Sequence, residues 1–156
     1  MLAENDTNEA MSYGPARLDY MLCFALYATS RATMDVYRPI LDELGLTYPQ
    51  YLVMIILWEH KTSSVKDIGN LLHLDSGTLS PLLKRLEAAG FIKRQRRSDD
   101  ERVVDISLTE AGQALEDRAA HIPEKFGCEL DLQFDEYSEL LGRLKKLLAQ
   151  INNTSA

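Results

Sequence analysis

The chain contains two cysteines, Cys23 and Cys128, and a thiol is the side chain best suited here to redox chemistry. Cys23 lies in the segment LDYMLCFALYATSRAT, residues 18–33, whose apolar and aromatic residues indicate a helix. A free cysteine in such surroundings usually packs as a small hydrophobic residue. An ionised thiol is instead a nucleophile that peroxides oxidise. The segment alone leaves both interpretations open, a core residue and a thiol placed to react.

The histidines do not suggest a metal centre. His60, His73 and His121 are scattered along the chain, with no spacing typical of a set of metal ligands. We therefore predict no metal site and no cofactor.

The composition is that of one globular domain. The chain has 156 residues, of which 46% are hydrophobic and 26% charged, enough to bury a sizeable core. No apolar run approaches the roughly 20 residues that a membrane span needs. The first residues, MLAENDTNEAMSYG, have neither the basic nor the apolar region of a secretory signal. We therefore expect a cytoplasmic protein with no membrane partner, in which a disulfide would be transient.

The charge distribution is uneven. The formal net charge of −7 argues at first against nucleic acid as a partner. However, the segment 84–102 holds seven basic residues, namely Lys84, Arg85, Lys93, Arg94, Arg96, Arg97 and Arg102. A basic stripe on an acidic body binds phosphates locally, although a run of charge is also the usual pattern of a solvated face.

The N-terminal part is predicted to form two helices. Apolar residues at helical spacing predict a helix over 18–44, which Pro39 should bend or split and Gly45 should end. A second helix starts at TYPQ, where Thr47 and Gln50 match a capping box, and continues through YLVMIILWEH.

The central segment, residues 63–108, combines two short helices with a β-hairpin. Ser64 and Asp75 are the predicted N-caps, and Ile68, Leu71, Leu72, Leu79, Leu82, Leu83 and Leu86 are the predicted core positions. Pro81 predicts an irregular start for the second helix, and Gly90 should end it. Alternating apolar and polar residues over 103–108 predict a strand that pairs with 92–96 across the polar turn RRSDDE.

The C-terminal part is predicted to be helical. Thr109 should cap a helix that Pro123 and Gly127 interrupt. A last helix has apolar residues at helical spacing, which are Tyr137, Leu140, Leu141, Leu144, Leu147, Leu148 and Ile151.

Two short helices, a brief turn and a basic hairpin together indicate a winged helix-turn-helix. We therefore predict a mainly α fold with a small β-hairpin. The predicted organisation is a flexible tail over 1–16 and one domain over 17–156. Within that domain the winged helix-turn-helix covers 63–108, and dimerisation helices cover 18–44 and 109–151.

This arrangement matches the physical demands of duplex DNA. The polar edge of the second short helix fits the major groove, where Lys84 and Arg85 can anchor the backbone. An arginine at the tip of the hairpin suits the narrow minor groove. A helical hairpin beside a solvated β-hairpin is the alternative that the pattern alone leaves open.

The sequence also resembles a known family. DERVVDISLTEAG, residues 100–112, is similar to the wing-to-helix signature of the multiple-antibiotic-resistance regulator (MarR) family. LDSGTLSPLLKRLEAAGFIKR resembles that family's recognition helix and first wing strand. LCFALYATSRA and VYRPILDELGLTYPQYLVMIILWE, together with Cys23, resemble the organic hydroperoxide resistance regulators of the two-cysteine type. The resemblance covers roughly residues 17–150.

The resemblance implies a homodimeric repressor that binds a double-stranded, inverted-repeat operator when reduced and releases it after reaction with an organic hydroperoxide. It implies that Cys23 is the sensing thiol, that Tyr37 and Tyr48 hydrogen-bond it, and that Cys128 bonds it across the dimer after oxidation. The DNA-binding residues implied for the recognition helix are Ser76, Thr78, Ser80, Lys84 and Arg85, and those for the wing are Arg94, Asp100 and Arg102.

The spacing of Cys23 and Tyr37 is compatible with such a dimer. These residues are 14 positions apart, a rise of roughly 21 Å along a helix, so they cannot touch within one straight helix. Contact requires a partner chain or a sharp fold-back. Activation of the thiol must come from hydroxyl donors and from the partner subunit. No basic residue lies within one helical turn of Cys23, and Asp19 disfavours the thiolate.

Three alternatives stay open. The tyrosines can be ordinary core residues with their hydroxyls tipped outward. The chain can be a MarR-type repressor gated by a reversibly bound phenolic ligand, with Cys23 merely packing. A thiol peroxidase is less favoured, because no Cys-x-x-Cys pair is present and Tyr20 stands where the peroxiredoxin arrangement has threonine.

Overall fold

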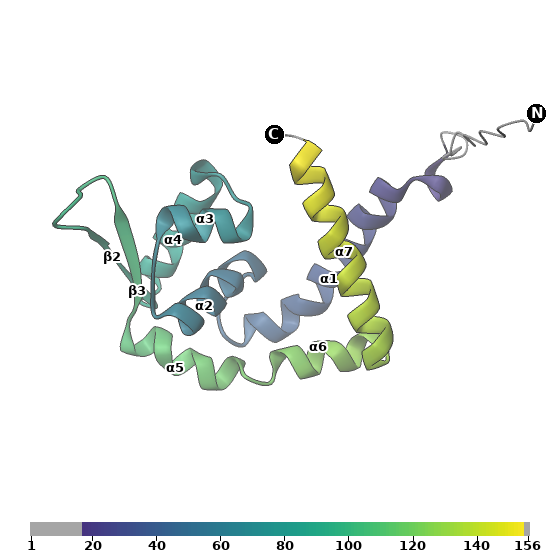
Figure 1. Ribbon diagram of the computed structural model, residues 1–156. Coiled ribbons are helices and arrows are strands. Elements are labelled where there is room, and N and C mark those ends of the chain that lie inside the picture. The colour runs from purple at the N-terminus through teal and green to yellow at the C-terminus, as the bar shows by residue number, and fades with distance from the viewer. Residues whose placement is uncertain (1–16, 155–156) are drawn as a thin grey trace, which may run out of the picture. The chain divides into compact units, whose positions relative to one another are not determined.

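The structure, a computed structural model, describes residues 17–154 (Figure 1). The tail predicted over 1–16 lies outside these residues. The elements in chain order are η1 (Leu18–Tyr20), α1 (Leu22–Asp42), α2 (Tyr48–His60), β1 (Thr62–Ser64), α3 (Val65–Leu72), α4 (Ser76–Ala88), β2 (Ile92–Arg96), β3 (Val104–Leu108), α5 (Glu110–Ala119), α6 (Ile122–Leu130) and α7 (Phe134–Thr154). The chain divides into two compact units, one ending at Asp35 and the other beginning at Val36.

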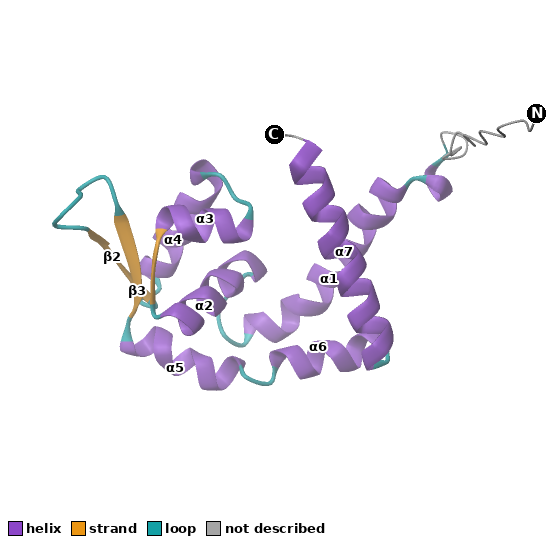
Figure 2. Ribbon diagram, in the orientation of Figure 1, coloured by secondary structure: helices purple, strands orange, loops and turns teal. Residues whose placement is uncertain are grey.

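The strands form a small antiparallel sheet, orange in Figure 2, in the order β1-β3-β2. β2 pairs with β3 from Ile92 opposite Leu108 to Arg96 opposite Val104, which confirms the predicted hairpin. β1 pairs with the other edge of β3 and was not predicted. Its three residues, Thr-Ser-Ser, have no apolar alternation, so only the neighbouring strand makes them a strand.

Side chains cap four helices at the positions predicted. The Gln50 Oε1 accepts the Thr47 N–H at 2.8 Å, Ser64 Oγ accepts the Asp67 N–H at 3.1 Å, Asp75 Oδ1 accepts the Thr78 N–H at 2.9 Å, and Thr109 Oγ1 accepts the Gly112 N–H at 3.0 Å. Each of these bonds satisfies a donor that the start of a helix leaves unpaired. The starts of α2, α3, α4 and α5 are therefore set locally.

The second short helix, α4, is more regular than predicted. It begins at Ser76, directly after its Asp75 cap, and continues through Pro81. The predicted irregular start is therefore wrong, because the Asp75 cap organises the first turn ahead of the proline. The helix ends at Ala88, and Gly90 follows its cap Ala89 in the predicted position, with a φ of +80° that suits glycine. The Phe91 N–H then donates to the Leu86 carbonyl at 3.1 Å and directs the chain into β2.

The core of the second unit surrounds α2. Val53, Met54 and Leu57 of α2 are fully buried, and they belong to one hydrophobic cluster with residues of α3, α4, the sheet and α5. From α4 this cluster takes Leu79, Leu83 and Leu86, as predicted. Leu71 of α3 was predicted to point inward but is 54% exposed. On this short helix Ile68 and Leu72 already supply the inward side.

The predicted split at Pro39 and the predicted break at Gly127 do not occur. α1 is one helix through Pro39, and the following Ile40 and Leu41 are buried, which holds the last turn in place. α6 runs through Gly127 and ends at Leu130, followed by the cap residue Asp131, whose φ of 49° is left-handed. The predicted break at Gly127 is therefore wrong, and Cys128 lies inside the last turn of α6. Pro123 does mark the start of α6, after α5 has ended.

Apolar side chains are exposed at both ends of the described chain. In the first unit they include Leu18, Tyr20, Met21 and Leu22. In the second unit α7 has no buried residue, although it carries the apolar residues predicted from its helical spacing. None of the helices within residues 17–154 is both long and apolar enough to cross a membrane.

Candidate nucleic-acid interface and thiol sites

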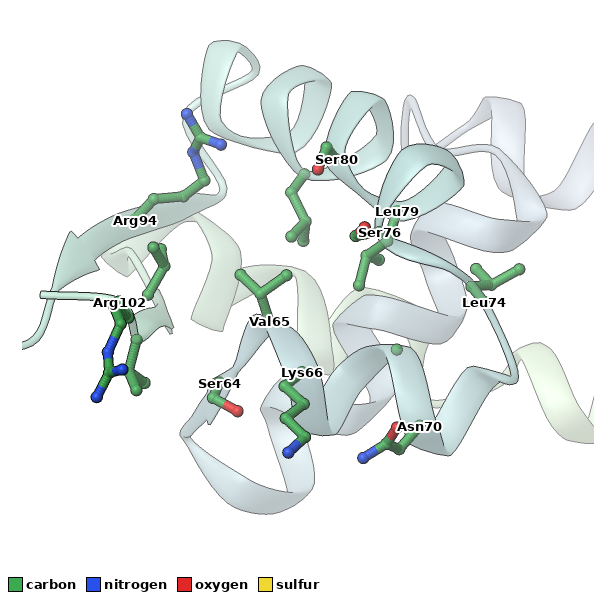
Figure 3. A pocket seen from close by; sticks show the side chains of 14 residues that line it. Ser64, Val65, Lys66, Asn70, Leu74, Ser76, Leu79, Ser80, Arg94 and Arg102 are labelled. Carbon is green, nitrogen blue, oxygen red and sulfur yellow. The ribbon is translucent and has the colours of Figure 1, made fainter. Parts of the chain in front are cut away.

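A groove of about 540 Å³ lies between α3, α4 and the β2-β3 hairpin, called the wing below (Figure 3). Its floor is apolar and includes Val65, Leu79 and Leu83. Its polar side chains include Lys66 and Asn70 from α3, Ser76 and Ser80 from α4, and Arg94 and Arg102 from the wing. Four predicted DNA-binding residues are thus brought to one groove.

Lys66 and Asn70 were not among the predicted site residues. They are exposed and lie four positions apart on α3, so they share one face of that helix. This spacing is a signal in the sequence, but two polar residues at i and i+4 are common on any solvated helix. Only the fold brings them into the same groove as Arg94 and Arg102.

The remaining predicted residues of α4 are exposed. Thr78 lies in the first turn, where its hydroxyl donates to Asp75 Oδ2 at 2.9 Å. The backbone N–H of Thr78, and then its hydroxyl, hold the pKa of Asp75 below its usual value, so this cap is ionised at neutral pH. Lys84 and Arg85 are exposed further along the helix. The helix therefore presents hydroxyls near its start and cations near its end.

At the tip of the wing, Asp100 holds Arg102. The Arg102 N–H and Nε both donate to Asp100 Oδ1, at 3.1 Å each. The Arg102 guanidinium, followed by its backbone N–H, lowers the pKa of Asp100. The Arg102 side chain is nevertheless 91% exposed, so the cation still faces solvent. Because a carboxylate is repelled by phosphate, this geometry favours a role for Asp100 in orienting Arg102.

Two further ion pairs stabilise the wing. Arg94 Nε lies 2.8 Å from Glu87 Oε2, which joins β2 to the C-terminal part of α4. Arg97 makes a bidentate pair with Asp105, at 2.9 and 2.8 Å, across the hairpin. Together with Arg102, three arginines of this basic segment are therefore paired with carboxylates.

Both cysteines are free and exposed. Cys23 lies in the first turn of α1 and belongs to the first unit. Cys128 lies in the last turn of α6, in the second unit, and its carbonyl accepts the Asp131 N–H at 3.4 Å. Exposure in the single chain is the access that a reactive thiol requires.

Tyr37 and Tyr48 are brought together, with ring centroids 4.7 Å apart. Tyr37 also stacks on Phe126 at 4.2 Å, with an interplanar angle of 20°. Tyr51 completes the group, 6.3 Å from Tyr37 and 6.4 Å from Tyr48. We call Tyr37, Tyr48, Tyr51 and Phe126 the aromatic cluster. Phe126 and Tyr51 were missed by sequence reasoning, since nothing local links α6 to α1 and α2.

The tyrosines of this cluster stay protonated at neutral pH. Burial, and then the neighbouring tyrosines, raise the pKa of Tyr37 well above its usual value. Burial is also the first cause that raises the pKa of Tyr48 and of Tyr51. Each hydroxyl is therefore a hydrogen-bond donor, which is the form that stabilises a thiolate.

An apolar cavity of about 380 Å³ adjoins the cluster. Its walls include Tyr37, Phe126, Phe134 and Tyr137, and it also touches Gly127, the residue before Cys128. Within residues 17–154, no group of three or more His, Cys, Asp or Glu side chains is placed to hold a metal ion.

A recognition helix beside a basic wing defines a winged helix-turn-helix protein. The family model described as transcriptional regulator SarA/Rot matches residues 35–118. The chain belongs to this family of MarR-like transcriptional regulators.

Individual relatives agree with this assignment. The chain is 54% identical over 107 residues to the organic hydroperoxide resistance transcriptional regulator of Bacillus subtilis, covering 69% of this chain and 73% of the relative. It is 46% identical over 138 residues to the transcriptional regulator TtmR of Methylorubrum extorquens, covering 88% and 71%.

Solved structures of AbfR, a protein of Staphylococcus epidermidis, are also similar. Reduced AbfR bound to DNA has a TM-score of 0.79 and 36% identity, covering 90% of this chain and 96% of AbfR. A disulfide-formed AbfR has a TM-score of 0.60 and 36% identity, covering 88% and 92%.

Proposed function

We propose that the chain is a homodimeric repressor that binds an inverted-repeat operator when Cys23 is reduced and releases it when an organic hydroperoxide oxidises Cys23. The observation that carries the proposal is the 54% identity to a regulator named for organic hydroperoxide resistance. The similar protein AbfR, solved both reduced on DNA and in a disulfide form, supports the same two-state behaviour.

The DNA-binding half of the proposal rests on α4 and the wing. Hydroxyls of Ser76, Thr78 and Ser80 would meet base edges or phosphates in the major groove. Lys84 and Arg85 would contact the backbone, with Arg94 beside them on the wing. Arg102, oriented by Asp100, would enter the minor groove.

The dimer half rests on the uncovered apolar faces. The exposed leucines of α7 and the apolar residues around Leu22 are surfaces that a second copy of the chain would bury. Two recognition helices related by a two-fold axis would then reach half-sites about one helical turn apart, roughly 34 Å.

The proposed chemistry consumes one hydroperoxide per thiol. The Cys23 thiol loses its proton, and the thiolate attacks the terminal oxygen of ROOH. The O–O bond breaks, the alkoxide takes up that proton and leaves as an alcohol, and Cys23 becomes a sulfenic acid. The thiol of Cys128 of the partner subunit then attacks the Cys23 sulfur, and water leaves as the disulfide forms. The protonated hydroxyls of the partner subunit's Tyr37 and Tyr48 would donate to the Cys23 thiolate, because Cys23 and Tyr37 of one chain lie on one helix, roughly 21 Å apart.

The position of Cys128 bears on how the disulfide would act. It lies in the last turn of α6, three residues before the left-handed Asp131 and the connection to α7. Helix ends open at lower cost than packed interiors. A disulfide there would therefore draw the α6-α7 connection toward Cys23, change the spacing of the two recognition helices and release the operator.

The test is an operator-binding titration with and without cumene hydroperoxide, on wild type, Cys23→Ser and Cys128→Ser. Cys23→Ser should bind DNA and ignore peroxide. Cys128→Ser should form a sulfenic acid but no covalent dimer. Wild type should give a peroxide-dependent dimer band on non-reducing gels, and dithiothreitol should restore DNA binding.

The same experiment separates the alternatives. If a phenolic ligand gates the repressor and Cys23 merely packs, peroxide treatment should have the same effect on DNA binding in wild type and in Cys23→Ser. A thiol peroxidase would consume peroxide repeatedly with an external thiol, whereas a sensor reacts once per reduced site. A covalent band that survives in either mutant, or a crosslink within one chain, would contradict the proposed mechanism.

A further inference from the structure

The indole of Trp58 makes a long-range contact that the proposed function has not used. Trp58, near the end of α2, is only 9% exposed. Its Nε1–H donates to the carbonyl of Gly112, in the first turn of α5, at 3.0 Å. The bond is buried and joins residues 54 positions apart. A buried indole N–H that loses its acceptor is left unsatisfied, so the contact fixes α5 against α2.

Gly112 is itself pressed against the turn that joins the recognition helix to the wing. A Cβ at Gly112 would lie 2.0 Å from the Phe91 carbonyl oxygen, so only glycine allows this approach. That oxygen also accepts the Thr109 N–H at 3.0 Å. The Thr109 hydroxyl donates to the Gly90 carbonyl at 2.6 Å. We call Gly90, Phe91, Thr109 and Gly112 the wing joint.

The other side of Trp58 faces the aromatic cluster. Its ring meets Tyr51 edge-on, with centroids 6.2 Å apart and an interplanar angle of 63°. Tyr51 in turn contacts both Tyr37 and Tyr48. A continuous series of side-chain contacts along α2 therefore leads from the sensor tyrosines to the wing joint.

We propose that Trp58 is the positioning residue that couples the aromatic cluster to the wing joint, so that a change at Tyr37 and Tyr48 alters the angle between α4 and the wing. The inference rests on the proposed function, because it assumes that the cluster responds to the state of Cys23. Its physical basis is the rigidity of each link: a buried hydrogen bond on one side and an edge-to-face ring contact on the other.

The first experiment uses Trp58→Phe, which keeps an aromatic ring and removes the N–H donor. Three quantities are measured: operator affinity when reduced, the rate of sulfenic-acid formation at Cys23, and operator affinity after cumene hydroperoxide. We expect the first two to match wild type. Oxidation should lower the operator affinity of wild type by about 5- to 150-fold, the usual range for coupled sites. In Trp58→Phe the same oxidation should lower operator affinity by about twofold or less.

A second variant guards against misfolding of the first. Replacement of Trp58 by benzothienylalanine keeps the shape of the indole and substitutes sulfur for the N–H group. If thermal melting shows that Trp58→Phe is unfolded, this variant decides the question by the same three measurements. Release of DNA with the full wild-type fold-change in a folded variant would overturn the inference.

Trp58 is the only tryptophan of the chain, so its fluorescence reports on the contact directly. Coupling between sites is reciprocal, so binding of operator DNA to the reduced protein should shift the Trp58 emission, and a non-specific duplex should not. An unchanged spectrum on operator binding would overturn the inference. This measurement uses no peroxide, so it tests the coupling independently of the redox proposal. If wild type keeps its DNA after oxidation, the redox proposal fails, and the fluorescence change on operator binding still tests the role of Trp58.

Discussion

Asp100 accepts two hydrogen bonds from one neighbour, the backbone N–H and the guanidinium Nε of Arg102, both at 3.1 Å. The acid therefore fixes the direction of a cation that is itself 91% exposed at the wing tip. Such a pair contributes little to the stability of the free protein, because both groups are solvated. Under the proposed function, the pair would present the arginine to DNA in one orientation.

This relationship predicts different effects for the two residues. Arg102→Ala should weaken operator binding by about 1–3 kcal/mol and lower the salt slope of binding by about one, because a cation leaves the interface. Asp100→Ala should weaken binding less and leave the salt slope unchanged, since only the orientation is lost. Titrations at several salt concentrations measure both. Tighter binding by Asp100→Ala would show that the carboxylate merely repels DNA.

A second prediction concerns Lys84 on the recognition helix. Lys84→Ala should weaken binding almost equally on operator and non-operator DNA, and lower the salt slope by about one. The reason is that a lysine on the phosphate backbone carries no sequence information. Lys145→Ala, on the exposed surface of α7, is the matched control and should change neither quantity. If the two substitutions weaken binding equally, Lys84 does not contact DNA.

A third prediction concerns α7 as a dimerisation helix. Leu144 is 40% exposed in the single chain, on a helix that buries no residue of its own. Leu144→Glu should convert a micromolar dimer into a monomer and abolish operator binding, because a charge would have to be buried in the interface. Sedimentation velocity measures this. Lys146→Glu, on the opposite side of the helix, introduces the same side chain and should leave the dimer intact.

A fourth prediction concerns stability at alkaline pH. The pKa values of Tyr37, Tyr48 and Tyr51 are raised in the folded protein from the usual 10.0, first by burial. The folded state thus holds these protons more tightly than the unfolded chain does. The stabilisation is complete below about pH 10 and is lost as the pH rises above it. Denaturant unfolding between about pH 8 and pH 11 should show this fall, and Tyr37→Phe should make it less steep.

A fifth prediction tests the close packing at the wing joint. Gly112→Ala should lower the free energy of unfolding by about 1–3 kcal/mol, because its Cβ would overlap the Phe91 carbonyl. Gly142→Ala is the control, since a Cβ at Gly142 meets nothing within 4 Å. It should leave stability unchanged or raise it by about 0.5–1 kcal/mol, as alanine favours a helix. Thermal melts of both variants make the comparison.

Most of the local structure followed from the sequence, because its causes lie within a few residues. Ser64, Asp75 and Thr109 cap helices by bonds to residues three positions ahead, and such bonds need no distant partner. The alternation over 103–108 and the polar turn before it were likewise enough to predict the hairpin, whereas its register came from the structure. The family resemblance, which the SarA/Rot model and the relatives confirm, also required only the sequence.

Only the tertiary structure decided what depends on distant partners. β1 is a strand because β3 lies beside it, and Leu71 is exposed because Ile68 and Leu72 face the core. Phe126 stacks on Tyr37 although 89 positions separate them. The Trp58–Gly112 bond likewise spans much of the chain. Short-range sequence patterns show which residues prefer to be buried and which can cap a helix. Which distant residue each one contacts depends on how all the elements pack around the same core.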